Sequence, residues 1–102
     1  MKIKGLWFFG ISGSGKSFLS KFLKKKIKNS ILLDGDDIRK FISFDLSYSI
    51  SDRVIQTKRM LGFAEICIKN RLFPIISTAY LNKKVYLNVK KRGILVAKVE
   101  RE

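Results

Sequence analysis

A glycine-rich stretch near the start of the chain ends in a lysine and a serine, in the pattern Gly10-x-x-Gly13-x-Gly15-Lys16-Ser17. Because glycine has no Cβ atom, the backbone can wrap closely round a phosphate and point successive N–H groups at its oxygens. A lysine at this spacing can reach the β- and γ-phosphates of a nucleotide, and the hydroxyl after it can bind Mg²⁺. The pattern predicts a phosphate-binding loop, and a chance glycine-rich turn is the alternative. The residues predicted to bind ATP are Gly10, Ser12, Gly13, Ser14, Gly15, Lys16 and Ser17, with Ser17 as the magnesium ligand.

A cluster of three aspartates follows the next apolar run, in the sequence LLDGDDIR. If that run is a strand of an open parallel sheet, Asp34, Asp36 and Asp37 lie at the carboxyl edge, where such sheets bind ligands. A carboxylate there can accept a hydroxyl proton, and Arg39 can pair with an anionic acceptor. Asp36 is the predicted base, and Lys16 is the second predicted catalytic residue. For Asp34 and Asp37 the alternative is structural, because an Asp-Gly pair makes turns and aspartate caps helices.

The spacing of apolar residues predicts the elements that would position these side chains. Strands are predicted at residues 3–9, 31–33, 74–80 and 93–99. Helices are predicted at residues 15–27, 36–43, 51–72 and 81–92, with a polar loop at 43–51. Strands that alternate with helices predict a parallel sheet with right-handed crossovers. The predicted fold class is therefore α/β, a P-loop hydrolase or kinase fold with helices flanking a parallel sheet, in one domain over residues 1–102.

Two of these helices have apolar residues at helical spacing, which predicts a buried stripe on each. The stripe of the first helix is Phe18, Leu19, Phe22, Leu23 and Ile27. The stripe of the long third helix is Val54, Met60, Leu61, Ala64, Ile68 and Leu72. Ser51 and Asp52 are predicted to cap the long helix, and Pro74 is predicted to open the third strand. Cys67 is predicted to be a small core side chain.

The chain is strongly basic, because 22 lysines and arginines stand against 8 acidic residues and give a net charge of +14. Such a charge attracts phosphates, nucleic acid or an anionic membrane. Most of the basic residues are lysines, and the aromatic residues cluster mainly in the apolar runs, so nucleic-acid binding is the weaker alternative. With no histidine and one cysteine, the sequence excludes a histidine-based catalytic triad and an internal disulfide. No apolar run is long enough for a membrane span and no signal peptide is evident, so a cytoplasmic location is expected.

Four motifs, GISGSGKS, LLDGDDIR, DLSYSISDR and KRMLGFAEI, occur in this order and together resemble the adenylylsulfate kinase family. Members of this P-loop family phosphorylate the ribose 3′-hydroxyl of adenosine 5′-phosphosulfate, with ATP as the donor. The resemblance runs from about Leu6 to Tyr80. It implies that the glycine-rich loop binds the ATP phosphates and Mg²⁺ and that Asp36 orients or deprotonates the acceptor hydroxyl. It also implies that Arg39 and Arg53 bind the phosphosulfate of the acceptor.

The acceptor site implied by the resemblance contains several substitutions. Tyr48 stands where the family has a phenylalanine that stacks on the adenine of the acceptor, and a tyrosine ring can also stack. Ser47 replaces a glycine, Gln56 an asparagine and Lys58 an arginine. After the third strand, STAYLNKKVY stands where the family has Ile-Ser-Pro-Tyr, and this resembles a divergent branch that phosphorylates other nucleotide-linked acids, such as cytidine diphosphoramidate. The predicted substrate-binding residues are Asp36, Arg39, Tyr48, Arg53 and Gln56.

The family's domain is longer than this chain, and its second half carries further strands, a basic lid and the pocket for the nucleotide base. Nothing after about Arg92 resembles that half, so an incomplete C-terminal part without the lid is expected. The leading hypothesis is an adenylylsulfate kinase that uses ATP and Mg²⁺. The alternatives are a kinase for cytidine diphosphoramidate and an inactive ATP-binding fragment completed by a partner chain. The expected partner is a small nucleotide substrate, with no nucleic acid and no membrane, and a homo-oligomer is left open.

Overall fold

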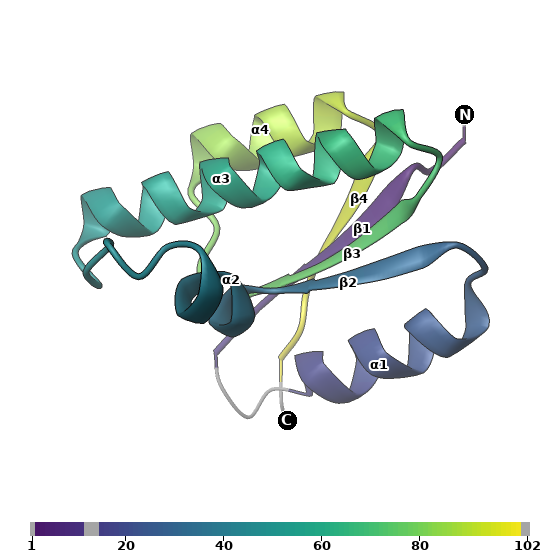
Figure 1. The fold of residues 1–102 in the computed structure, drawn as a ribbon, viewed down its shortest axis with the longest axis horizontal. Coiled ribbons are helices and arrows are strands. Elements are labelled where there is room, and N and C mark those ends of the chain that lie inside the picture. The colour runs from purple at the N-terminus through teal and green to yellow at the C-terminus, as the bar shows by residue number, and fades with distance from the viewer. Residues whose placement is uncertain (1, 12–14, 101–102) are drawn as a thin grey trace.

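The computed structural model describes residues 2–11 and 15–100 of the chain. This part of the chain forms a sheet of four parallel strands in the order β2-β3-β1-β4, with helices on both faces (Figure 1). The strands are β1 (Gly5–Phe9), β2 (Ser30–Asp34), β3 (Phe73–Thr78) and β4 (Ile94–Lys98). The helices are α1 (Lys16–Lys26), α2 (Gly35–Phe41), α3 (Ile50–Lys69) and α4 (Lys83–Lys91). The predicted α/β class and the alternation of strands and helices are confirmed.

The parallel register brings the carboxyl ends of β1, β2 and β3 to the same edge of the sheet. Phe9 of β1 pairs with Thr78 of β3, and Asp34 of β2 pairs with Ser77 of β3. β1 runs into the glycine-rich loop and α1, while β2 runs directly into α2. This edge therefore gathers the loop and the aspartate cluster, as expected of an open parallel sheet.

One face of the sheet is covered by α3 and α4, and the buried core lies on this face (Figure 1). The core cluster consists of Trp7, Ile38, Met60, Leu61, Ala64, Ile76, Val85, Val89 and Ile94. The ring N–H of Trp7 donates a hydrogen bond of 2.9 Å to the Thr78 hydroxyl. Because this donor is satisfied, the largest core side chain is buried without an unpaired polar atom.

The opposite face is covered by α1, which packs on β1, β2 and β3 (Figure 1). The predicted apolar stripe of α1 is only partly buried: Leu19 and Leu23 are half-buried, whereas Phe18 is 77% exposed. On β4, Leu95 alternates with the core residue Ile94 and is 50% exposed. The prediction that Phe18 would be buried was therefore wrong, because this residue of the first turn of α1 borders an open cavity instead of packing on the sheet.

The N-terminus of α3 also differs from the prediction. Ser49, rather than Ser51 or Asp52, caps the helix, since its hydroxyl accepts a hydrogen bond of 3.2 Å from the backbone N–H of Asp52. The helix ends at Lys69, so Leu72 lies beyond it and is exposed. The remaining stripe residues, Val54, Met60, Leu61, Ala64 and Ile68, are buried or half-buried as predicted.

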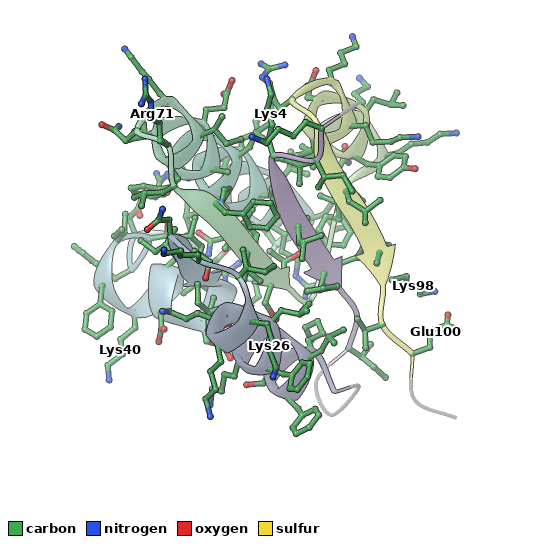
Figure 2. The ribbon with its side chains drawn as sticks, turned by 90° about the vertical axis from the view of Figure 1, so that its right-hand side faces the viewer. Lys4, Lys26, Lys40, Arg71, Lys98 and Glu100 are labelled. Carbon is green, nitrogen blue, oxygen red and sulfur yellow. The ribbon has the colours of Figure 1, made fainter. Side chains whose placement is uncertain are left out.

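The basic residues lie on the outside of the molecule. Figure 2 shows Lys26, Lys40 and Arg71 projecting away from the sheet. Lysines occupy the last turns of α1 and α4, where the helix dipole is negative. Within the described ranges, no helix combines the length and the apolar composition needed to cross a membrane.

Candidate active site

A cleft of about 730 Å³ opens at the carboxyl edge of the sheet. Apart from Gly10, it is lined by every predicted site residue that the structure describes. These are Gly15, Lys16, Ser17, Asp36, Arg39, Tyr48, Arg53 and Gln56. Residues separated by up to forty-one positions in the sequence thus share one cavity of the size that binds small molecules.

On the loop side of the cleft, the lysine is folded back on its own loop. Lys16 Nζ donates hydrogen bonds to the carbonyl oxygen of Gly10 at 2.6 Å and to that of Ile11 at 3.2 Å. Gly15 stands before α1 with a φ of 100°, a left-handed conformation that favours glycine. The predicted phosphate contacts Ser12, Gly13 and Ser14 lie outside the described residues. The amine of Lys16 and the N-terminus of α1 therefore both lie at the cleft.

The aspartates at the end of β2 have different surroundings. Asp34 is the N-cap of α2, because its Oδ1 accepts a hydrogen bond of 3.3 Å from the backbone N–H of Asp36. Asp34 therefore has a structural role, but as the cap of a helix that includes Gly35 rather than as part of a turn, and Asp37 is an exposed residue of the first turn of α2 rather than its cap. Burial raises the pKa of Asp34, the charges of Asp36 and Asp37 raise it further, and Lys16 and the Asp36 N–H oppose them. Asp36 is exposed and lines the cleft.

Gly35 lies where α2, α3 and β3 approach one another. A Cβ atom on Gly35 would lie 3.2 Å from the carbonyl oxygen of Ser77, so a larger residue would push these elements apart. The Gly35 carbonyl accepts a hydrogen bond of 3.1 Å from Gln56 Nε2. Gln56 is only 4% exposed, and its Oε1 has no hydrogen-bond partner among the described residues. Gln56 thus lies at the predicted site, with its amide nitrogen engaged by the protein.

Among the residues that line the cleft, an arginine and a tyrosine lie in contact. The Arg39 guanidinium carbon is 4.2 Å from the centroid of the Tyr48 ring, a cation–π geometry. Arg39 Nη1 also donates a hydrogen bond of 3.1 Å to the Ser47 carbonyl. Tyr48 is 70% exposed, so much of its side chain remains accessible to a ligand. Sequence reasoning predicted both residues but not their contact.

Several cleft residues were missed from the sequence. Thr57, Ser77 and Thr78 all line the cavity. Ser77 and Thr78 end β3, so polar residues at the end of a buried strand were the signal that could have identified them. Thr57 follows Gln56 on α3, and its hydroxyl donates to the Val54 carbonyl. The STAY sequence, residues 77–80, was interpreted as a departure from a family pattern, although all four of its residues line the cleft.

The cleft offers oxygen ligands suited to magnesium. The Ser17 hydroxyl and the carboxylates of Asp34 and Asp36 line the same cavity, and Mg²⁺ prefers such oxygen donors. Across residues 2–11 and 15–100, no group of three or more His, Cys, Asp or Glu side chains could bind a metal ion alone. These residues fit a magnesium ion that takes its other ligands from phosphates and water.

The family model described as "Adenylylsulphate kinase" matches residues 3–90. The chain belongs to the adenylylsulfate kinase family. The solved structures of this family that resemble the chain are P-loop kinases, in agreement with the predicted fold.

Among curated relatives, the adenylyl-sulfate kinase of Buchnera aphidicola subsp. Acyrthosiphon pisum is 39% identical over 85 residues. The match covers 78% of this chain and 41% of the relative. The chain therefore spans less than half the length of this relative.

Two solved structures have the same fold. The hexameric APS kinase from Thiobacillus denitrificans has a TM-score of 0.79 at 25% identity, over 96% of this chain and 22% of that one. The APS kinase of Mycobacterium tuberculosis in complex with AMPPNP and APS has a TM-score of 0.69 at 26% identity, over 95% of this chain and 61% of that one.

Proposed function

We propose that the chain is one P-loop kinase domain that transfers the γ-phosphoryl group of ATP to the ribose 3′-hydroxyl of adenylylsulfate. The observation that carries the proposal is the shared cleft, in which Lys16 and Ser17 lie together with Asp36, Arg39 and Tyr48. The Mycobacterium tuberculosis relative, described in complex with AMPPNP and APS, supports a site for two nucleotides. Family membership supports the reaction class.

On the donor side, the loop and the start of α1 bind the phosphates of ATP. Lys16 exchanges its bonds to the Gly10 and Ile11 carbonyls for charge-assisted bonds to phosphate oxygens. The Ser17 hydroxyl would hold Mg²⁺, with Asp34 and Asp36 close by in the cleft. When bound, this ion neutralises charge on the transferred phosphoryl group.

On the acceptor side, Asp36 accepts the proton of the attacking hydroxyl. The hydroxyl oxygen forms a bond to the γ-phosphorus, the bond from that phosphorus to the β,γ-bridging oxygen breaks, and ADP leaves. Arg39 and Arg53 bind the phosphosulfate, whereas Tyr48 and Gln56 contact the nucleoside. In-line transfer depends mainly on positioning and charge, which these residues supply from two sides of one cavity.

A second acceptor is favoured by the side chains that differ from the family pattern. The Ser47 hydroxyl donates a hydrogen bond of 2.7 Å to Asp52, and Gln56 bonds to the Gly35 carbonyl. The segment that departs most from the family pattern, STAYLNKKVY, begins with four residues that line the cleft, Ser77, Thr78, Ala79 and Tyr80. Cytidine diphosphoramidate is therefore the second candidate acceptor, and it is tested by ADP release in place of adenylylsulfate.

The α1 face supports a further proposal, that a second copy of the chain covers it. Phe18 and Leu95 are exposed, and the Thiobacillus denitrificans relative is described as hexameric. Sedimentation should then show concentration-dependent association. A monomer at all concentrations would contradict this.

The kinase proposal is tested by ADP release from the purified chain with MgATP, with and without adenylylsulfate. Adenylylsulfate should stimulate release. Lys16→Ala should abolish the stimulated rate, and Asp36→Asn should lose it while ATP binding persists. Lys25→Ala, an exposed lysine of α1 outside the cleft, is the matched control and should behave as wild type. Undiminished turnover in Lys16→Ala or Asp36→Asn would refute the assignment.

A further inference from the structure

The connection between α2 and α3 is held against α3 by hydrogen bonds to two residues of this helix. Asp52 Oδ2 accepts hydrogen bonds from the backbone N–H of Ser47 at 2.8 Å and from its hydroxyl at 2.7 Å. Further along α3, Arg59 makes a bidentate pair with Asp45, with distances of 2.8 Å from Nη1 to Oδ1 and 3.0 Å from Nη2 to Oδ2. Arg59 Nη1 also donates to the Ser43 hydroxyl at 3.1 Å. Together these contacts fix residues 43–47 against one helix.

The geometry of α3 explains why both contacts reach the same segment. Asp52 and Arg59 are seven residues apart, so they lie on the same side of the helix about two turns from each other. The next residue after Ser47 is Tyr48, whose ring stacks on Arg39. Arg39 in turn donates to the Ser47 carbonyl. Residues 43–47, which are held against α3, therefore end next to Tyr48 and Arg39 in the cleft.

Asp45 and Arg59 act at a distance from the cleft, because neither lines it. Arg59 lowers the pKa of the Asp45 carboxyl, and the hydrogen bonds from Ser47 lower the pKa of Asp52. Both carboxylates are therefore ionised at neutral pH and keep their partners. Because Arg59 is bidentate, it fixes the orientation of Asp45 as well as its distance.

We propose that Asp45 and Arg59 are positioning residues, which hold residues 43–47 so that Tyr48 is already stacked on Arg39 before the acceptor nucleotide arrives. A nucleobase then stacks on a ring that is already ordered, and binding does not have to order the connection. The identity of the ligand rests on the proposed function. The ordering of the connection does not depend on it.

The test compares Arg59→Met, Asp45→Asn and the charge-exchanged double variant Asp45→Arg/Arg59→Asp with wild type. Arg92→Met is the matched control, because it removes another exposed ion pair, with Glu65, away from the connection. Calorimetry measures the Kd of adenylylsulfate and of ATP. Amide hydrogen exchange measures the protection of Ser47, whose N–H is bonded to Asp52.

Arg59→Met and Asp45→Asn should weaken adenylylsulfate binding about tenfold, leave the Kd of ATP unchanged and accelerate exchange at Ser47. The charge-exchanged variant should restore most of the affinity, and Arg92→Met should change neither property. Wild-type affinity in Arg59→Met, an equal loss for ATP, or an equal loss in Arg92→Met would overturn the proposal.

The two proposals fail in different ways. If the wild-type chain binds no adenylylsulfate, the proposed function fails, and hydrogen exchange alone decides the inference. Faster exchange at Ser47 in Arg59→Met than in Arg92→Met would support the positioning role. Equal exchange in the two variants would contradict it.

Discussion

The two faces of the sheet are packed very differently. On the face under α3 and α4, Trp7, Ile76 and Val89 are completely buried. On the face under α1, Ile75 is also completely buried, but Leu95 of the edge strand β4 is 50% exposed and Phe18 of α1 is 77% exposed. The difference indicates that α1 covers only the middle of its face of the sheet, whereas α3 and α4 enclose the core cluster. Truncation of a fully buried side chain and of an edge-strand side chain should therefore have very different effects on stability.

The largest expected effect is on the buried face. Ile76→Ala should lower the free energy of unfolding by about 2–5 kcal/mol, because it removes a fully buried side chain and leaves a cavity. Urea denaturation followed by circular dichroism measures this. Leu95→Ala, on the other face of the sheet, should cost less than about 1 kcal/mol. Equal decreases in the free energy of unfolding of the two variants would contradict the difference in packing between these positions.

A smaller effect is expected where the buried face meets the site. Gly35→Ala should destabilise the chain by about 1–3 kcal/mol, since the added methyl group would crowd the Ser77 carbonyl. Gly62→Ala is the control, because a Cβ atom there meets nothing within 4 Å, and it should stabilise α3 by about 0.5–1 kcal/mol. Thermal melting of both variants should give shifts of opposite sign. A higher melting temperature for Gly35→Ala would contradict this explanation, because it would show that a methyl group near the Ser77 carbonyl does not destabilise the fold.

On the α1 face, removal of one buried hydroxyl group should increase the stability of the chain. Ser20 is buried, and among the described residues its Oγ has no hydrogen-bond partner. Ser20→Ala should therefore raise the free energy of unfolding by up to about 1 kcal/mol, because it removes an unpaired polar atom and favours the helix. Ser43→Ala is the matched control and should destabilise the chain, since the buried Ser43 hydroxyl accepts from Arg59. If Ser20→Ala lowered the free energy of unfolding as Ser43→Ala does, the explanation would be wrong, because the Ser20 hydroxyl would then have a hydrogen-bond partner.

The smallest effect concerns the pH dependence of Asp34. Its raised pKa means that the folded state binds a proton more tightly than the unfolded state, so stability falls as pH rises through the folded pKa. Asp34→Asn keeps a capping side chain and should be more stable at neutral pH by less than about 1 kcal/mol, since solvent screens this partly exposed group. Thermal melts should show this difference vanish below the ordinary aspartate pKa. A difference independent of pH would refute the explanation.

The sequence predicted the order of the elements because strands and helices differ clearly in apolar spacing. It did not predict the cap of α3, since Ser47, Ser49 and Ser51 alternate and all can serve as caps. It also overestimated the burial of Phe18, because spacing identifies the residues that share a helix face but not which of them borders an open cleft. The exposure of this face follows only from the arrangement of the elements.

The candidate site was predicted in part. The presence of Lys16, Ser17 and Asp36 in one cleft could be predicted, because a glycine-rich loop and a strand-terminal aspartate both lie at the carboxyl edge of a parallel sheet. The contact between Arg39 and Tyr48 could not, because it depends on how the α2–α3 connection folds back on α3. The role of Asp34 as a cap was not predicted, because an Asp-Gly pair indicates a turn and the cap was expected from a later aspartate; the hydrogen bond from the Asp36 N–H identifies it.

The central claim is that the cleft transfers phosphate to a nucleotide hydroxyl rather than to water. Phosphorus NMR of the purified chain with MgATP and adenylylsulfate tests it most directly, because it distinguishes a ribose 3′-phosphate from inorganic phosphate. The account predicts that a 3′-phosphomonoester resonance grows together with those of ADP. Growth of ADP and inorganic phosphate alone, or no change at all, would contradict it.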